Sequence, residues 1–587
     1  DLGFRLPPFS IRARQRGRRT FRRCLTAAMS KTVVVASGYF NPLHFGHVSF
    51  LQKAKDAGTH LIVIVNNDAQ AERRRVGLPG ISMPARDRVR LVRSLACVDA
   101  AMEAVDEDDS VADTLRMLHP DLFANGGKQV ATEKEAAVCA ELGITLLVGL
   151  GIEMLLLQPF TQHYEWGKKR GESAVALLAG ESEWSPGSLS SPNGSRPYAE
   201  LWMGDHPSGP SKVRTPNGAM TGCLISTLKR SPSVLGEKLA QDGTLPFLMK
   251  VLSIEKALSI QAHPDRELAA RLHRDRPDVY KDANHKPEIA IALTAFEALC
   301  GFRQVSELHA FVVAVPELRS AVGEAAVAAL QGAVTSGELA EEEAAIRLAY
   351  CTMMRTPEAE IERLVPEMVA RDAPEAENGH SAALAKAYNI VKRCNKQFGN
   401  DIGLFSIFFL NYVEMSVGDC LYMAQNIPHA YLSGDIVECM ACSDNVVRGG
   451  LTPKYKDIDV LCEMLVYKGG LPPCIVPCPV GDMTWLYAHK DLEEFQVTKM
   501  LLPAGKARRF CFSAQGPTLG FVFSGAGLLK ISDETTKLVA GVVFLLSAGV
   551  DCDVIAVDDL HCYVACCPPQ YFNPPARKDL MKAFPHA

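Results

Sequence analysis

Three separated clusters in the sequence hold side chains of the kinds that bind metal ions. Gln261 and His263 are two residues apart and would share one face of a strand. Glu288 follows Pro287, which keeps the preceding backbone extended, and His429 forms the third cluster. Two imidazoles, a carboxylate and an amide oxygen can enclose a small divalent ion and leave room for water or substrate. This donor set suits zinc, with other transition ions as chemical alternatives.

Longer motifs around these clusters resemble the type I phosphomannose isomerases. The resemblance extends from about Leu155 to the C-terminus, and one small departure is Asp205, where the family pattern has threonine. The segments that carry it are Tyr164–Gly167, Tyr198–Gly204, His206–Ser211, Ser259–Asp265, His285–Glu288, His429–Asp435 and the stretch from Glu438 to Lys454.

The resemblance implies a zinc-dependent enzyme that interconverts mannose 6-phosphate and fructose 6-phosphate, with one zinc ion per site. The zinc ligands that it implies are Gln261, His263, Glu288 and His429. The catalytic residues that it implies are Arg448, Lys286, His285, Asp444 and Glu438. The substrate-binding residues that it implies are Ser259, Lys454, Trp166, Glu200 and Tyr431.

Aldose–ketose isomerisation explains why such residue types are needed. A proton moves between adjacent carbons through an enediol, and a cation stabilises the charge that develops on oxygen. His285, or a lysine perturbed by nearby zinc, could act as the base. Arg448 offers a bidentate fork to a phosphate dianion, and Lys286 and Lys454 could add point charges. The sequence leaves open which residue is the base and which binds phosphate.

A second motif, the segment Gly38–His47, follows a predicted strand and opens a predicted helix. Its two histidines, His44 and His47, lie three apart around a glycine. Backbone N–H groups at a helix N-terminus attract a polyphosphate, and the imidazoles could stabilise a leaving pyrophosphate. An isolated motif of this length is weak, but its position in a β-α-β unit strengthens it.

The segment from Thr32 to about Gly149 resembles the cytidylyltransferase-like nucleotidyltransferases. The nucleotide-binding residues that this implies are His44, His47, Gly38, Asn125 and Gly126. The implied substrate is CTP or ATP with Mg²⁺. Lys128 stands where relatives carry an acidic residue, and the closing serine- and threonine-rich motif has no clear counterpart. The alternative is therefore a nucleotide-binding-like fold with weak or no catalysis.

These sites require a multidomain protein. Strands at 32–36, 61–65 and 145–148 with an intervening helix over Val48–Ala57 predict a Rossmann-like parallel sheet. For the rest of the chain, the isomerase resemblance implies cupin-like β-barrel or jelly-roll domains with a helical insertion. The predicted divisions are a disordered arginine-rich leader (1–29), a nucleotidyltransferase-like domain (30–150), a catalytic cupin-like domain in two parts (151–302 and 401–485), the helical insertion (303–400) and a C-terminal cupin-like lobe (486–587).

Bulk composition excludes several functions. The net charge of −5 over 587 residues gives no reason to expect nucleic acid as a partner, and no apolar run is long enough to span a membrane. The 18 cysteines are scattered, and Cys439 and Cys442 read as reduced core thiols. We expect a soluble cytoplasmic monomer. The leader is either translated upstream sequence before Met29 or an organelle transit peptide.

The leading interpretation is an isomerase fused to a nucleotidyltransferase-like domain. One alternative is a sugar-phosphate nucleotidyltransferase whose isomerase half supplies its substrate. A cupin sugar-binding module without catalysis is a third, which the complete set of ligand-type residues argues against.

Overall fold

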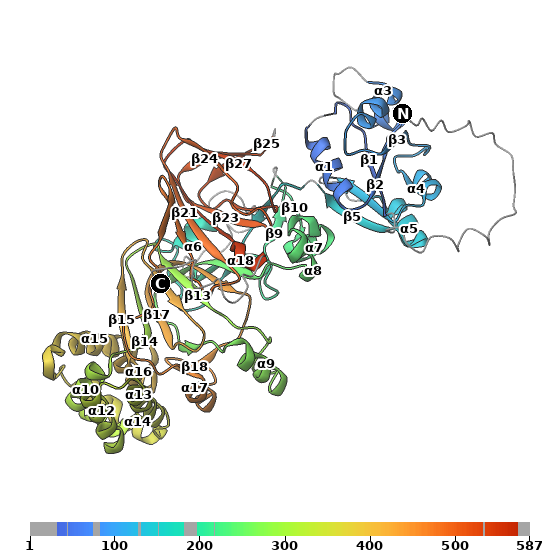
Figure 1. Cartoon of the computed structure of the whole chain (residues 1–587). Coiled ribbons are helices and arrows are strands. Elements are labelled where there is room, and N and C mark those ends of the chain that lie inside the picture. Colours follow the sequence, from blue (N-terminus) through green and yellow to red (C-terminus); the bar gives the residue numbers. More distant parts are fainter. Residues whose placement is uncertain are drawn as a thin grey trace. The chain divides into compact units, whose positions relative to one another are not determined.

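The computed structural model describes residues 32–43, 45–73, 83–126, 131–150, 152–180, 196–215, 218–531 and 534–572 (Figure 1). The predicted leader (1–29) and nearly all of the loop predicted at 182–196 lie outside these residues. The chain divides into two compact units between Leu147 and Val148. Each unit is considered by itself.

The N-terminal unit is a parallel sheet with intervening helices, as the sequence predicted. Its strands are β1 (Val33–Gly38), β2 (His60–Val65), β3 (Ala100–Glu103), β4 (Leu122–Gly126) and β5 (Thr145–Leu150). Its helices are α1 (Phe45–Asp56), α2 (Asp68–Arg73), α3 (Ala85–Arg93), α4 (Ala112–Leu118) and α5 (Glu133–Leu142).

In the strand order β3-β2-β1-β4-β5, β1 lies at the centre of the sheet. The chain adds β2 and β3 on one side of β1 and then β4 and β5 on the other side. β1 pairs in parallel with β2 and with β4. Its residues Val34, Val35 and Ala36 are fully buried, as expected for a central parallel strand. The sequence predicted β1, β2 and β5 but missed β3 and β4, because β3 is short and partly exposed and β4 ends in Asn125 and Gly126, which are not typical of a strand.

A buried arginine organises the carboxyl-terminal edge of this sheet. Arg88, in α3, is fully buried and donates to the carbonyl oxygens of Tyr39 and Asn66, which follow β1 and β2. It also forms an ion pair with Asp68 at 2.7 Å. The arginine therefore ties together the turns at the edge of the sheet where parallel sheets bind their ligands.

The second unit is built from antiparallel sheets. The strands of its first part are β6 (Met154–Gln158), β7 (Phe160–Gln162), β8 (Glu200–Met203), β9 (Lys212–Arg214), β10 (Met220–Cys223), β11 (Phe247–Ile254), β12 (Ile260–Ala262), β13 (Glu288–Ala292) and β14 (Phe296–Phe302). After the helical insertion come β15 (Leu410–Met415), β16 (Cys420–Met423), β17 (His429–Ala441), β18 (Val447–Gly450), β19 (Cys478–Gly481) and β20 (Thr484–Tyr487). The last strands are β21 (Gln496–Leu502), β22 (Ala507–Phe510), β23 (Thr518–Ser524), β24 (Ala526–Ile531), β25 (Glu534–Val539), β26 (Val543–Leu546), β27 (Cys552–Ala556) and β28 (Leu560–Cys566).

Most helices of this unit belong to the insertion, and they gather at one end of the unit (Figure 1). They are α10 (Val305–Ala314), α11 (Pro316–Val322), α12 (Glu324–Ser336), α13 (Leu339–Met354), α14 (Glu358–Ala370), α15 (Ser381–Phe398) and α16 (Gly403–Phe409). The others are α6 (Ala174–Leu178), α7 (Leu224–Arg230), α8 (Glu237–Asp242), α9 (Arg266–Asp275), α17 (Ile458–Met464) and α18 (Pro569–Phe572). The helical run extends past the predicted end at 400, because the apolar segment Gly403–Phe409 forms α16 before the strands return.

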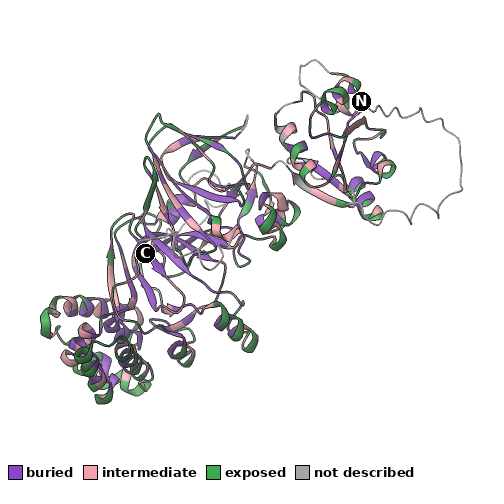
Figure 2. Cartoon of the chain, viewed as in Figure 1, coloured by how far each residue is buried: buried purple, intermediate pink, exposed green. Residues whose placement is uncertain are grey.

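Three sheets make up the unit, with the strand orders β10-β9-β6-β26-β23-β28-β21-β20-β19, β15-β14-β17-β11-β8-β7 and β22-β27-β24-β25. Strands β12, β13, β16 and β18 pair with the middle sheet off its main path. Central strands are buried while helices of the insertion keep an exposed face (Figure 2). That these sheets close into cupin-like barrels remains a prediction.

The middle sheet buries both faces. One face packs around Tyr431, Phe296 and Leu252, and the other packs against the strands of the C-terminal lobe. Because both faces are covered by apolar side chains, the charged residues among these strands stand out as candidates for chemistry.

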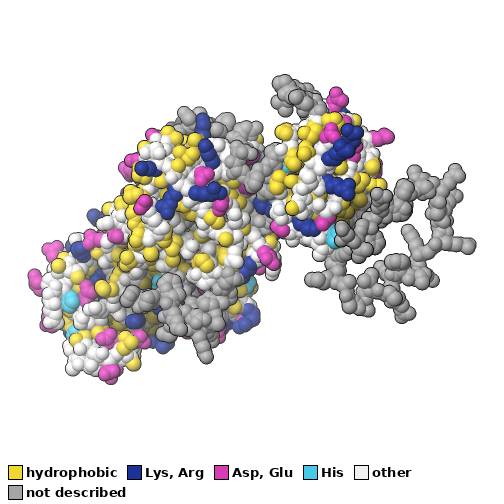
Figure 3. Space-filling view, turned by 45° about the horizontal axis from the view of Figure 1, so that its top comes forward, with side chains coloured by type: hydrophobic (Ala, Val, Ile, Leu, Met, Phe, Trp, Pro, Cys, Tyr) yellow, Lys and Arg dark blue, Asp and Glu magenta, His cyan; other side chains and the backbone are white. Residues whose placement is uncertain are grey.

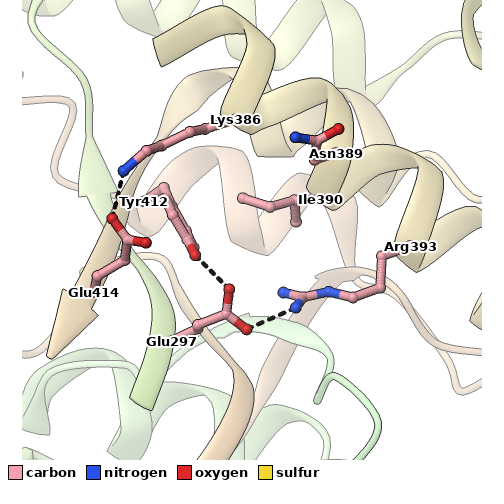
Figure 4. Close-up of a pocket in the computed structure, with 7 residues that line it drawn as sticks. All are labelled: Glu297, Lys386, Asn389, Ile390, Arg393, Tyr412 and Glu414. Carbon is pink, nitrogen blue, oxygen red and sulfur yellow. Dashed lines mark hydrogen bonds and ion pairs between the residues drawn. The ribbon is translucent and has the colours of Figure 1, made fainter. Parts of the chain in front are cut away.

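A polar pocket of about 350 Å³ lies where the insertion meets the sheet, lined by Glu297, Lys386, Asn389, Ile390, Arg393, Tyr412 and Glu414 (Figure 4). Glu297 accepts hydrogen bonds from Arg393 of α15, at 2.6 Å, and from Tyr412 of β15. Lys386 pairs with Glu414 at 2.5 Å. The pocket contains none of the predicted site residues and serves to join α15 to the sheet.

The surface of the described residues mixes both signs of charge. On the face drawn in Figure 3, basic and acidic side chains are interspersed over the second unit. None of the described helices combines the length and the apolar character that crossing a bilayer requires.

Candidate active site

Three of the predicted site residues lie in one row across three neighbouring strands. Gln261 in β12 stands opposite His429 in β17 on one side and opposite Arg448 in β18 on the other. Residues directly opposite each other in antiparallel strands point to the same face of the sheet. Strand pairing therefore brings together two candidate ligands and the candidate catalytic arginine, although 187 residues separate the first from the last.

The carboxylate of Glu288 lies between two imidazoles. Glu288 is the first residue of β13. Its Oε1 atom lies 3.4 Å from His263 Nε2, and its Oε2 atom lies 3.6 Å from His429 Nε2. One ligand atom from each of the three residues falls within 4.8 Å of the others, and all three residues are buried. The separations exceed those of hydrogen bonds, which leaves room for an ion among the three atoms.

Both imidazoles are oriented by the backbone. His263 Nδ1 is 2.7 Å from the Asn445 carbonyl oxygen, and His429 Nδ1 is 2.9 Å from the Ile427 carbonyl oxygen. Each Nδ1 carries the proton that it donates, so a neutral ring would present its Nε2 lone pair toward Glu288. These two Nε2 atoms and Glu288 Oε2 are buried without a hydrogen-bond partner. Buried orphan atoms of this kind, converging on one point, fit a bound cation.

Electrostatics favour the same arrangement. Burial lowers the pKa of His263 to about 4, so its imidazole is neutral at physiological pH and can donate a lone pair. Burial alone would raise the pKa of Glu288, but His263 and Lys286 outweigh it and hold that pKa well below its ordinary value. The cluster is thus an ionised carboxylate with at least one neutral imidazole, the protonation that zinc requires.

A second charged network adjoins this cluster. Lys250, from the buried strand β11, lies 3.0 Å from Glu438 Oε2 and 3.5 Å from Glu200 Oε2. Tyr431 donates to Glu438 Oε1 at 3.1 Å, and Trp202 Nε1 donates to Glu200 at 2.5 Å. The structure thus brings the predicted residues Glu200, Tyr431 and Glu438 together around one ammonium group.

Sequence reasoning missed Lys250. The available signal was a single charge inside the apolar segment Phe247–Ile254, every residue of which is buried. Burial alone would lower the pKa of Lys250, but Glu438, Glu200 and Glu288 together raise it, so the lysine stays charged. Burial raises the pKa of Glu438, against the opposing effect of Lys250.

His285 and Lys286 point to different neighbours. Lys286 Nζ is 3.3 Å from Glu288 Oε1, so the lysine lies beside the cluster of His263, Glu288 and His429. His285 is buried, with Nε2 2.6 Å from Glu494 Oε1 and Nδ1 2.7 Å from Gln425 Nε2. Both ring nitrogens of His285 already have partners, and Glu494 is a further residue that the sequence did not reveal.

The other predicted residues lie nearer the surface. Asp444 is exposed and accepts from Ser208, and the neighbouring Asn445 orients His263. Lys454 is exposed, beyond the end of β18, and Ser259 is half-buried just before β12. Trp166 packs against the apolar cluster that contains Tyr431.

In the N-terminal unit, the predicted nucleotide-binding residues fall at one edge of the sheet. Gly38 ends β1, Asn125 and Gly126 end β4, and these two parallel strands are neighbours. His47 lies in the first turn of α1, with its ring 5.0 Å from that of Phe40. The prediction for His44 lies outside the described residues.

Comparison with known families agrees with the division of the chain into two compact units. Residues 154–305 match the phosphomannose isomerase type I catalytic domain, and residues 321–410 match the helical insertion domain of the same enzymes. Residues 35–149 match the cytidylyltransferase-like family.

Individual relatives place the chain within one family. It is 40% identical over 418 residues to mannose-6-phosphate isomerase 2 of Arabidopsis thaliana, covering 70% of this chain and 92% of the relative. It is 36% identical over 416 residues to the mouse mannose-6-phosphate isomerase, covering 69% of this chain and 96% of the relative. The chain belongs to the type I phosphomannose isomerase family, and the resemblance seen in the sequence is confirmed.

Solved structures share the fold. A mannose 6-phosphate isomerase bound with zinc and yttrium superimposes with a TM-score of 0.58 at 24% identity, covering 71% of this chain and 99% of that chain. A phosphomannose isomerase from Salmonella typhimurium, the R274A mutant, gives a TM-score of 0.57 at 24% identity, with 70% and 99% covered.

Replacing Glu288 by glutamine should abolish tight metal binding, because the amide cannot supply the negative charge between the two imidazoles. We expect zinc affinity to fall by more than about 100-fold, beyond the loss typical of a residue that only orients a ligand. Zinc content after dialysis against a chelator, measured by mass spectrometry, checks this. Glu414→Gln, at an exposed strand position, should retain zinc. Equal zinc content in both variants would disprove the ligand role.

Asp205, the departure from the family pattern, should make stability depend on pH. Burial raises its pKa from 3.8 to about 6. The folded state therefore holds this proton more tightly than the unfolded state, and stability falls as pH rises from about 4 to above 6. The Asp205→Asn variant keeps an acceptor for the Leu245 amide. At pH 8 its free energy of unfolding should exceed that of the parent by up to about 3 kcal/mol, with little difference at pH 4. Denaturant unfolding at both pH values measures it, with the exposed Asp482→Asn as control.

Proposed function

We propose that the chain is a zinc-dependent aldose–ketose isomerase that interconverts mannose 6-phosphate and fructose 6-phosphate. The observation that carries the proposal is the convergence of His263, Glu288 and His429, with Gln261 and Arg448 in the adjoining strand row. The curated mannose-6-phosphate isomerases that the chain resembles, at 36–40% identity over most of their length, support the same reaction.

The residues fit a zinc ion held by His263, Glu288 and His429, with the Gln261 amide oxygen as the fourth ligand. When bound, the ion would stabilise negative charge on the sugar oxygens as a Lewis acid. Lys286, 3.3 Å from Glu288, would keep that carboxylate ionised and could also bind the substrate.

Glu438 is the residue that we propose for proton transfer. Its burial raises its pKa toward the range in which a carboxyl group can both accept and return a proton. Tyr431 and Lys250 hold its two oxygens, at 3.1 and 3.0 Å, and so fix its position. His285 is less suited to the task, since Glu494 and Gln425 occupy its ring nitrogens.

Arg448 is the proposed phosphate ligand. Arg448 lies opposite Gln261 in the strand row and is half-buried, and its guanidinium has no hydrogen-bond or ion-pair partner among the described residues. Burial lowers the pKa of Arg448, but an arginine stays charged at physiological pH. A charged guanidinium group that has no protein partner and adjoins the candidate zinc site suits a dianionic phosphate.

The zinc-loaded chain should isomerise mannose 6-phosphate, and Arg448→Ala should retain zinc but lower kcat/KM by about 100-fold or more through loss of the phosphate contact. A coupled assay for fructose 6-phosphate measures the rate. Activity should be lost when a chelator removes the metal and should return when zinc is added. Arg319→Ala, in the exposed part of the insertion, is the matched control. Absence of turnover in the zinc-loaded parent would refute the proposed function.

A second activity is proposed for the N-terminal unit: binding of CTP or ATP with Mg²⁺, as a nucleotidyltransferase would require. It is supported by Gly38, Asn125 and Gly126 at the carboxyl ends of adjacent strands, where the chain reverses direction across the sheet. Such a point is the usual ligand site of an open parallel sheet. The cytidylyltransferase-like match over residues 35–149 agrees with it.

The nucleotide proposal predicts that the full chain binds CTP or ATP in the presence of Mg²⁺, and that His47→Ala weakens binding by about 10-fold or more. Titration calorimetry measures both affinities. His60→Ala, at the opposite end of the neighbouring strand β2, should bind like the parent. Unchanged affinity in His47→Ala, or no binding by the parent, would contradict a nucleotide site at this edge. Isomerase activity should be the same in all three proteins.

A further inference from the structure

Two cysteines meet where the helical insertion packs against α17. Cys351 belongs to α13 and Cys462 to α17, and their side chains interact directly. Tyr467 joins the pair, because its hydroxyl lies 3.1 Å from Cys351 Sγ and donates to the Cys462 carbonyl oxygen at 2.9 Å. Cys351 is partly exposed and Cys462 is buried, so one thiol can be reached from solvent and the other lies behind it.

Two arginines flank the accessible thiol: Arg347 of α13 lies one turn before it, and Arg355, which caps the C-terminus of α13, lies one turn after it. Arg355 donates to the Cys351 carbonyl oxygen at 3.3 Å and forms an ion pair with Asp459 of α17 at 2.9 Å. Arg347 lies with its guanidinium carbon 5.9 Å from the Tyr467 ring centroid. The cysteine pair therefore has a cation on either side, a setting that stabilises a thiolate.

The two thiols differ in acidity. The hydrogen bond from Cys462 lowers the pKa of Cys351 to about 6, with the two arginines acting in the same direction and burial opposing them. The same hydrogen bond, together with burial, raises the pKa of Cys462. Cys351 is thus the nucleophile of the pair, and Cys462 is a protonated thiol that can resolve it.

We propose that Cys351 and Cys462 form a redox-active dithiol, at which a hydroperoxide converts the two thiols into a reversible disulfide. The Cys351 thiolate attacks the terminal peroxide oxygen, which gives Cys351 sulfenic acid and, from hydrogen peroxide, one water after proton uptake. The Cys462 thiol then attacks the sulfenic sulfur, forming the S–S bond and releasing a second water. Two electrons pass from the two sulfurs to one peroxide, so the step balances.

The residues that precede the two cysteines contact β18, the strand of Arg448. A Cβ placed on Gly449 would lie 2.9 Å from Leu461 Cδ2 and 3.5 Å from the Tyr350 hydroxyl, and these two residues immediately precede Cys462 and Cys351. The disulfide proposal does not depend on the proposed isomerase function, since bond formation is measured on the protein itself.

The test is peptide mapping of the full chain after oxidation. The reduced protein, freed of reductant, is treated with hydrogen peroxide at increasing molar ratios, alkylated with N-ethylmaleimide and digested without reductant. We expect a peptide pair cross-linked through Cys351 and Cys462 that disappears after dithiothreitol treatment. Cys478→Ser, at an exposed cysteine, should leave the yield of this pair unchanged. Failure to find the cross-link, or cross-linking of other cysteines at lower peroxide, would overturn the proposal.

Single variants test the assigned order of attack. Cys462→Ser should leave a sulfenic acid on Cys351 that dimedone traps, whereas Cys351→Ser should leave Cys462 unoxidised at the same peroxide concentration. At pH 7, iodoacetamide should label Cys351 about 10-fold faster than the exposed Cys474, because most of Cys351 is thiolate. Arg355→Gln should slow this labelling severalfold. Equal labelling rates at Cys351 and Cys474 would remove the basis for Cys351 as the nucleophile.

Discussion

The second unit depends on the burial of one carboxylate. Glu288 is 2% exposed, and taking its charge out of water would cost several kcal/mol if nothing compensated it. The Lys286 ammonium group, 3.3 Å away, supplies an opposite charge, and a cation held among Glu288, His263 and His429 would supply more. Strands β12, β13 and β17 must therefore meet in one register for this site to form. The stability of the site and the pairing of the strands that hold it therefore depend on each other.

A second arrangement of the same kind lies beside it. Lys250 is buried between Glu200 and Glu438, and its ammonium group is 4.9 Å from the centre of the Trp202 ring. Each charge in this network has an opposite neighbour, and the hydroxyl of Tyr431 fills a remaining acceptor position. The two networks thus concentrate buried charge around neighbouring strands of the middle sheet.

The sequence predicted much of this site, because residue types and local spacing report chemistry well. It identified the buried histidines and Glu288 as ligand candidates, and the five-stranded parallel sheet was foreseen as a fold class. It did not reveal Lys250 or Glu494, whose partners lie 188 and 209 residues away in the chain. The tertiary fold creates such contacts, through strand pairing for Lys250 and through packing of connecting segments for Glu494, and no local pattern in the sequence encodes the partner. For the same reason, the sequence could list His285 as a base but could not show that both its nitrogens were already engaged.

The helical insertion enters and leaves the sheet at almost the same point. β14 ends at Phe302 and β15 begins at Leu410, and these two residues face each other across an antiparallel pair. In topological terms, the whole helical block occupies the position of a hairpin turn. Lengthening a loop whose ends are already adjacent adds little closure entropy. The block can therefore change in size without altering strand register, which gives this chain a place to acquire new surface while the strands of the candidate site stay fixed.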